Sequence, residues 1–201
     1  MQQVNASDNL LVLGTAQDGG YPHTGCSEDC CREAWKDSNQ KRLIASLAVL
    51  DGKDCFLVDI TPDFKYQLQL IERHINEKPR ISGICITHAH LGHYMGLLEL
   101  GLEVMNTNDI PVYVMPKMKS FLENNAPFTQ LLELNNIRLL ALQDNYPIDI
   151  FKDVKITPFQ VPHRNEYSET VGYRIQSSHH SVIYIPDIDS WDSWDTDINQ
   201  L

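Results

Sequence analysis

Three histidines lie close together near the middle of the sequence. His88, His90 and His93 follow an apolar, β-branched run, residues 81–86, which predicts a buried strand. Imidazole is the commonest side-chain ligand for a transition metal, and three imidazoles within six positions can converge on one or two ions. Titratable groups clustered at a strand end are also typical of a functional site. The spacing therefore predicts a metal centre here, in preference to three surface histidines in a turn.

The elements that must position these histidines are mostly short strands. A hairpin is predicted where two apolar runs flank the tetrapeptide DGKD, and a helix where apolar residues recur at helical spacing over 62–76. The predicted strands are 9–15, 43–50, 55–60, 81–86, 111–115, 137–142, 154–161, 170–176 and 181–185. Many short strands with few helices favour a β-rich α/β sandwich over a doubly wound parallel sheet.

The totals describe an ordinary globular chain. Its 201 residues are 42% hydrophobic and 21% charged, which predicts a single domain over 1–201. The net charge of -11 argues against nucleic acid as an electrostatic partner. The expected partner is a small-molecule substrate. No apolar run reaches the ~18 residues of a membrane span, and no signal peptide is visible. We therefore expect a cytoplasmic protein, with a mature secreted form as the alternative, and the sequence leaves the oligomeric state open.

The histidine segment resembles a known motif. Residues 87–96, THAHLGHYMG, resemble the T-H-x-H-x-D-H-x-x-G motif of the metallo-β-lactamase superfamily, with Gly92 in the place of the aspartate. His163 and Asp187 each follow a predicted strand, in the order in which that family carries further metal ligands. The early loop GTAQDGGYPHTGC and the segment PDID are similar, more narrowly, to the branch that contains the pyrroloquinoline-quinone biosynthesis protein B. The resemblance covers about residues 11–191 and implies an αββα sandwich, which looks short at its C-terminus because family members usually continue past the bridging aspartate.

The resemblance also implies a role for each ligand. His88, His90 and His163 would hold one metal ion. His93 and Asp187 would serve a second ion, with Asp187 bridging the two. Asp187 is also the candidate catalytic residue, which would accept a proton from bound water or complete the first site. Imidazoles and a carboxylate suit zinc, with iron or manganese as alternatives.

Two departures from the family pattern weaken the second site. Gly92 offers no side chain. The family's last ligand, a histidine on a late strand, has no match either, because the last histidines of the sequence, His179 and His180, lie before Asp187 in a predicted turn. A site with only His93 and Asp187 is under-liganded, so we expect one metal ion. On this reasoning a Gly92→Asp substitution should raise the metal content.

A second group of possible ligands is a cysteine cluster in the early loop. Cys26, Cys30 and Cys31 form a C-x3-C-C pattern, and cysteines of this loop bind a structural zinc in the family branch that the chain resembles. A structural zinc needs four closed ligands, so free or buried thiols are the alternative. Cys55 and Cys85 lie in apolar strand patterns and are expected in the core. An odd cysteine count is a poor disulfide framework and favours a reducing compartment.

Three functions follow as hypotheses. The first is a metal-dependent hydrolase that uses a metal-activated water on an ester, phosphoester or similar bond. The second, implied by the family branch, is an iron-dependent oxidative enzyme. The third is a non-catalytic remnant of the fold that acts as a binding domain. Asp18 and His23, in the Gly-rich loop after the first strand, are expected to line the mouth of the pocket.

Overall fold

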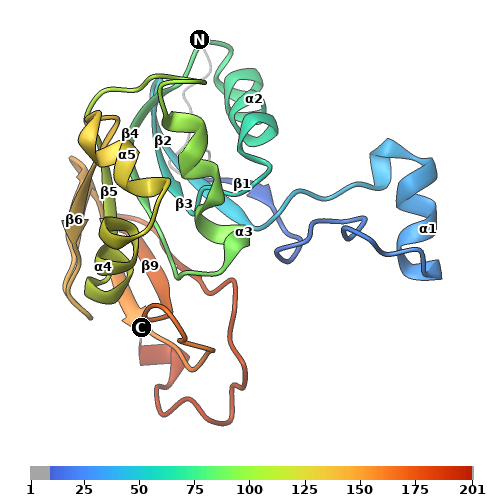
Figure 1. Ribbon diagram of the computed structural model, residues 1–201. Helices are drawn as coiled ribbons and strands as arrows, with labels where there is room; N and C mark the ends of the chain where they lie inside the picture. Colours follow the sequence, from blue (N-terminus) through green and yellow to red (C-terminus); the bar gives the residue numbers. More distant parts are fainter. Residues whose placement is uncertain (1–9, 201) are drawn as a thin grey trace.

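The computed structural model describes residues 10–200, whose strands form two sheets that pack face to face (Figure 1). Residues 1–9 and 201 lie outside the described residues, and with them the first residue of the predicted strand 9–15 and the N-terminal segment in which no signal peptide is visible.

The larger sheet has six strands in the order β1-β2-β3-β4-β5-β6. These strands are β1 (Leu10–Gly14), β2 (Ser46–Asp51), β3 (Asp54–Val58), β4 (Arg80–Cys85), β5 (Ile110–Val114) and β6 (Ile137–Ala141). β1, β2 and β3 pair antiparallel, so the predicted DGKD hairpin is confirmed, whereas β3 to β6 pair parallel. Because the carboxyl ends of parallel strands meet at one edge, the residues after β3 and β4 are neighbours.

The smaller sheet has four antiparallel strands in the order β10-β9-β8-β7. They are β7 (Ile148–Phe151), β8 (Val154–Gln160), β9 (Val171–Ser177) and β10 (Ser181–Tyr184). His163 follows β8 and Asp187 follows β10, as the sequence predicts.

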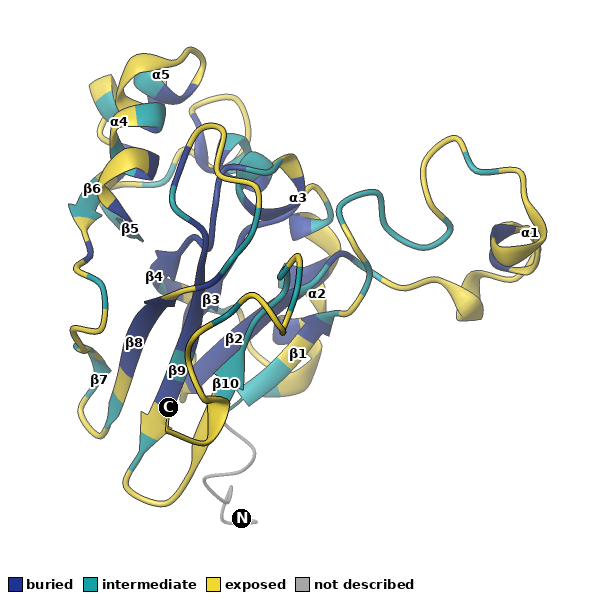
Figure 2. Cartoon of the chain, turned by 90° about the horizontal axis from the view of Figure 1, so that it is seen from below, coloured by how far each residue is buried: buried dark blue, intermediate teal, exposed yellow. Residues whose placement is uncertain are grey.

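Helices cover the outer face of the six-stranded sheet (Figure 1). They are α2 (Phe64–Ile75), α3 (Leu91–Tyr94), η3 (Met95–Leu100), α4 (Pro116–Asn124) and α5 (Phe128–Glu133). The helix α1 (Asp29–Lys36) lies apart from both sheets at the end of an extended loop (Figures 1 and 2). No helix of residues 10–200 is long and apolar enough to cross a membrane.

Three layers of the predicted αββα sandwich are thus formed by residues 10–200. No α-helix of this described part covers the outer face of the four-stranded sheet. There, Trp194 of the C-terminal segment stacks on Phe159 of β8, with ring centroids 5.8 Å apart. The fold class is confirmed, and α5 and β7 are elements that the sequence analysis missed.

Two hydrophobic cores hold the layers together. One fills the space between the helices and the six-stranded sheet, and the other lies between the two sheets. Figure 2 shows in dark blue that most of β3 and β4 is buried. Tyr173 of β9 belongs to the second core and is fully buried, and its hydroxyl donates a 2.8 Å hydrogen bond to the carbonyl of Ile86. This bond ties the four-stranded sheet to the chain just after β4, two residues before His88.

We expect Tyr173→Phe to lower the free energy of unfolding by about 1–3 kcal/mol, because the buried carbonyl of Ile86 loses its donor. Urea denaturation monitored by circular dichroism measures this change. Tyr146→Phe, at a tyrosine that is 62% exposed, is the matched control and should leave stability unchanged. Equal stability of the two variants would contradict the role given to Tyr173.

Candidate metal centre

The histidine loop begins where β4 ends. His88 is 1% exposed and His93 is 2% exposed, so both imidazoles are held inside the protein. His93 lies on the short helix α3, whose backbone is fixed by a hydrogen bond from the amide of Ile60 to the carbonyl of His93 (2.9 Å). His90 is the residue before α3, and its ring is mostly buried.

Loops of the four-stranded sheet bring the remaining predicted residues to the histidines. The amide of Ala89 donates to Ser168 Oγ (2.8 Å), and the amide of Val171 donates to the carbonyl of Thr87 (3.1 Å). The amide of Asp189 donates to the carbonyl of Pro162 (2.9 Å), which places the segment after β10 beside the loop after β8. The site therefore lies at the edge where the two sheets meet.

Four predicted ligands converge on one point. His90 Nδ1 lies 2.9 Å from His88 Nε2 and 3.1 Å from His163 Nε2. Asp187 Oδ2 lies 3.4 Å from His88 Nε2, and the four donor atoms all fall within 4.8 Å of one another. Ligand atoms about 2.0–2.1 Å from a tetrahedral ion are about 3.3 Å apart, so these side chains fit a transition-metal ion.

The second nitrogen of each imidazole faces an oxygen atom. His93 Nδ1 donates to Asp59 Oδ2 at 2.7 Å, and His163 Nδ1 donates to Asp189 Oδ1 at 2.7 Å. His88 Nδ1 lies 3.0 Å from Thr87 Oγ1, and His90 Nε2 lies 3.4 Å from Glu166 Oε2. Such outer partners fix the orientation of metal-ligating histidines and are typical of built metal sites.

A second group of donors adjoins the first and shares Asp187. His93 Nε2 lies 3.0 Å from Asp187 Oδ2 and 3.2 Å from Asp18 Oδ1. Asp18, His93 and Asp187 place one donor atom each within 4.8 Å of the others. Asp187 Oδ2 therefore faces both groups, which is the position that a bridging carboxylate requires.

Burial and neighbouring charges together shift the pKa values of the site residues. Burial lowers the pKa of His93, but Asp59, Asp18 and Asp187 together raise it well above its ordinary value. Burial raises the pKa of Asp187, but hydrogen bonds to His88 and His93 bring it far below its usual range. Burial also lowers the pKa of His88, which keeps that imidazole neutral and available as a ligand.

Asp59 is a site residue that the sequence analysis did not identify. It is 1% exposed, directly follows β3, and accepts hydrogen bonds from the Thr87 amide (2.8 Å), the Thr87 hydroxyl (3.0 Å) and His93. The signal was available, since a carboxylate within the apolar run CFLVDI is out of place in a buried strand unless it has partners. Glu166 and Asp189 were likewise not assigned to the site.

We expect Asp59→Asn to weaken metal binding about 10- to 100-fold, because the amide cannot fix His93 as a carboxylate does. Asn tolerates the positive φ of Asp59 (63°), so the backbone should be preserved. Competition with a chromogenic chelator measures the affinity, and Asp51→Asn, at an exposed position of β2, is the control. Unchanged affinity in Asp59→Asn would show that this carboxylate does not position His93.

The cysteine cluster is also brought together by the structure. The Sγ atoms of Cys26 and Cys30 lie 3.8 Å apart, and those of Cys30 and Cys31 lie 3.9 Å apart. The three thiols form a group of possible ligands without a fourth member among residues 10–200. Cys55 and Cys85 are buried in the core, as expected. The structural zinc remains a prediction.

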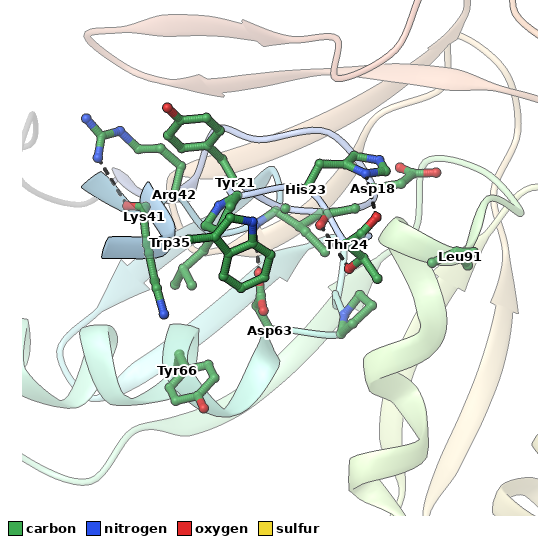
Figure 3. Close-up of a pocket in the computed structure, with 16 residues that line it drawn as sticks. Asp18, Tyr21, His23, Thr24, Trp35, Lys41, Arg42, Asp63, Tyr66 and Leu91 are labelled. Carbon is green, nitrogen blue, oxygen red and sulfur yellow. Dashed lines mark hydrogen bonds between the residues drawn. The ribbon is translucent and has the colours of Figure 1, made fainter. Parts of the chain in front are cut away.

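Two cavities open beside the histidines. A cavity of about 190 Å³ is lined by His90, His163, Arg164 and Asp187 together with part of the early loop. A larger cavity of about 910 Å³ adjoins it. Figure 3 shows this larger cavity, lined by Asp18, Tyr21, His23, Thr24, Trp35, Lys41, Arg42, Asp63, Tyr66 and Leu91 among others.

The early loop forms the wall between the two cavities. Asp18 and His23 line both of them, in agreement with the expectation that they line the mouth of the pocket. In Figure 3, they lie on one side of the larger cavity, whereas Lys41 and Arg42 lie on the other. His179 and His180 lie far from these walls, in the exposed turn between β9 and β10.

The two sheets, the helical layer and the histidine cluster at the sheet edge define the metallo-β-lactamase fold. Residues 55–200 match the family model of the β-lactamase superfamily domain, and the chain belongs to this family.

Individual relatives narrow the comparison to one branch. The chain is 27% identical over 198 residues to coenzyme PQQ synthesis protein B of Xanthomonas campestris pv. campestris (strain B100), covering 88% of this chain and 64% of that protein. The chain therefore spans just under two thirds of the length of this curated relative.

Comparison with solved structures gives the same fold. Zn2+-bound PqqB from Methylobacterium extorquens superposes with a TM-score of 0.76 at 23% identity, over 91% of this chain and 67% of that one. A diphosphatase from the PhnP family matches with a TM-score of 0.61 at 25% identity, over 83% of this chain and 61% of that one. The chain thus has the fold of a group that contains both PqqB proteins and hydrolases.

Proposed function

We propose that this chain is a metal-dependent hydrolase that acts through a metal-activated water on an ester or phosphoester of a small molecule. The observation that carries the proposal is the convergence of His88 Nε2, His90 Nδ1 and His163 Nε2 on one point, with Asp187 beside them. Three imidazoles and a carboxylate suit zinc, with iron or manganese as alternatives. These residues would hold a divalent metal ion, which would supply a hydroxide at neutral pH by lowering the pKa of a bound water to near ~7.

The residues around the cluster have separate roles in this proposal. The lowered pKa of Asp187 keeps it ionised, and it faces both donor groups, so it would serve as a ligand and orient the attacking water. Arg164 lines the smaller cavity with His90 and His163, where its guanidinium would bind an anionic group of the substrate. The larger cavity, with Lys41 and Arg42 on one side, has room for the rest of a small molecule.

Relatives support hydrolysis at the level of the family. One solved structure with this fold is a diphosphatase from the PhnP family, which is 25% identical to the chain. A phosphoryl group is consistent with Arg164 beside the cluster, because Arg is suited to bidentate recognition of phosphate.

The second candidate is an iron-dependent oxidative reaction at the same residues. It is favoured by the similarity to coenzyme PQQ synthesis protein B, at 27% identity over 88% of the chain. The two candidates differ in the metal that supports turnover and in the need for oxygen.

Substitution of both His88 and His90 by alanine should abolish metal binding at the cluster and lower phosphodiesterase activity by about three orders of magnitude. The estimate follows from several kcal/mol of transition-state stabilisation by the metal, at 1.36 kcal/mol per tenfold in rate. Hydrolysis of bis(p-nitrophenyl) phosphate is followed for protein purified without added metal and then given zinc, manganese or ferrous iron, with and without oxygen.

A matched control is the replacement of His179 and His180 by alanine, which likewise removes two histidine side chains, but from the exposed turn between β9 and β10. This control should retain full metal content and activity. Turnover only with ferrous iron and oxygen would favour the oxidative candidate. A wild-type chain that binds no metal at the cluster would refute both enzymes and leave the non-catalytic remnant.

A further inference from the structure

Position 92 has no room for a side chain. A Cβ atom built on Gly92 would lie 2.4 Å from Asp18 Oδ1 and 2.7 Å from the Cα atom of Asp18. Both distances are far shorter than a van der Waals contact, and the second involves backbone. The place that a side chain at position 92 would take is thus filled by Asp18, which comes from the loop after β1.

The carboxylate of Asp18 faces His93 and Asp187, the two residues that leave the second metal site short of a ligand on their own. Its Oδ1 atom lies 3.2 Å from His93 Nε2, which itself lies 3.0 Å from Asp187 Oδ2. These separations are close to the ~3.3 Å expected between donors around one tetrahedral ion. Asp18 keeps 35% of its side chain exposed, so water and substrate can reach this face of the group.

Backbone contacts hold the loop in this position. The amide of Gly20 donates to the carbonyl of Gln17 at 2.7 Å, which closes a tight turn around Asp18, and Gly20 adopts a positive φ of 73°. The amide of Ala45 donates to the carbonyl of Ala16 at 2.8 Å and joins the loop to the start of β2. Asp18 is therefore held by the fold in this position.

We propose that Asp18 is the carboxylate ligand of a second divalent-metal site, completed by His93 and the bridging Asp187, and that it replaces the aspartate absent at position 92. This inference rests on the proposed function, because it requires the first metal site to exist beside it. It corrects the expectation of an under-liganded second site: the missing carboxylate is present, but it comes from a distant part of the chain.

The close approach of the two residues also reverses the expected effect of Gly92→Asp. The new side chain would meet Asp18, including its Cα atom, and displace the loop. Gly92→Asp should therefore lose metal, whereas the sequence alone suggested a gain.

The experiment compares bound zinc per chain in the wild type, Asp18→Asn and Asp153→Asn, after equilibration with zinc and removal of the excess by gel filtration. Asn has nearly the shape of Asp, and Asp153 lies exposed in the turn between β7 and β8. We expect Asp18→Asn to hold one zinc fewer than the wild type and Asp153→Asn to match the wild type. Zinc on the cysteine cluster cancels in this difference.

A second variant and a second measurement make the result independent of the folding of Asp18→Asn. Gly92→Ala should lose the same single zinc, because its Cβ atom displaces Asp18. X-ray absorption spectra of the wild type should contain a zinc–zinc distance of about 3.5–4 Å that is absent from both variants. Circular dichroism verifies that each variant is folded.

The outcomes separate this inference from the proposed function. Equal zinc content in the wild type and Asp18→Asn, with no zinc–zinc distance, would overturn the second site and leave Asp18 as an ion-pair partner of a protonated His93. Loss of zinc in the His88 and His90 double variant would then still support the first site. Unchanged zinc in that double variant would instead refute the proposed function.

Discussion

The buried carboxylate of Asp59 is the contact on which the arrangement of the site depends. A charge that is almost completely removed from water is tolerated only when hydrogen bonds and opposite charge surround it. Asp59 obtains them from the backbone and hydroxyl of Thr87 and from the imidazole of His93. It thereby joins the end of β3, the end of β4 and the start of the helical layer, and it fixes the direction in which the histidine loop leaves the sheet.

The four-stranded sheet supplies the ligands of the site that the six-stranded sheet does not carry. His163 and Asp187 lie on loops of the four-stranded sheet, and their approach depends on the core between the sheets. Tyr173 belongs to that core and also bonds to the chain beside the histidine loop. Packing energy and site geometry are therefore coupled, which explains how loops can carry functional residues with the precision that metal ligation requires.

The residues that could be predicted from the sequence are those whose signal is local. His88, His90 and His93 stand within six positions after an apolar strand, and most of the strands were located because their periodicity is local too. Elements with little periodicity, such as the four-residue β7 and the six-residue α5, were missed. Asp18 was expected only at the mouth of the pocket, and no local signal marked it as a ligand, since its proximity to His93 arises only when the loop after β1 folds over α3.

The contact between Asp18 and Gly92 has a consequence for how such chains are recognised. The two positions compete for one volume, so each constrains the other although they are distant in the sequence. Relatives with a glycine at the fifth position of the H-x-H-x-[DG]-H motif should carry an aspartate in the loop after the first strand, and the two should covary. A search that demands the motif aspartate would classify such chains as degenerate, although the donor has only moved to another part of the fold.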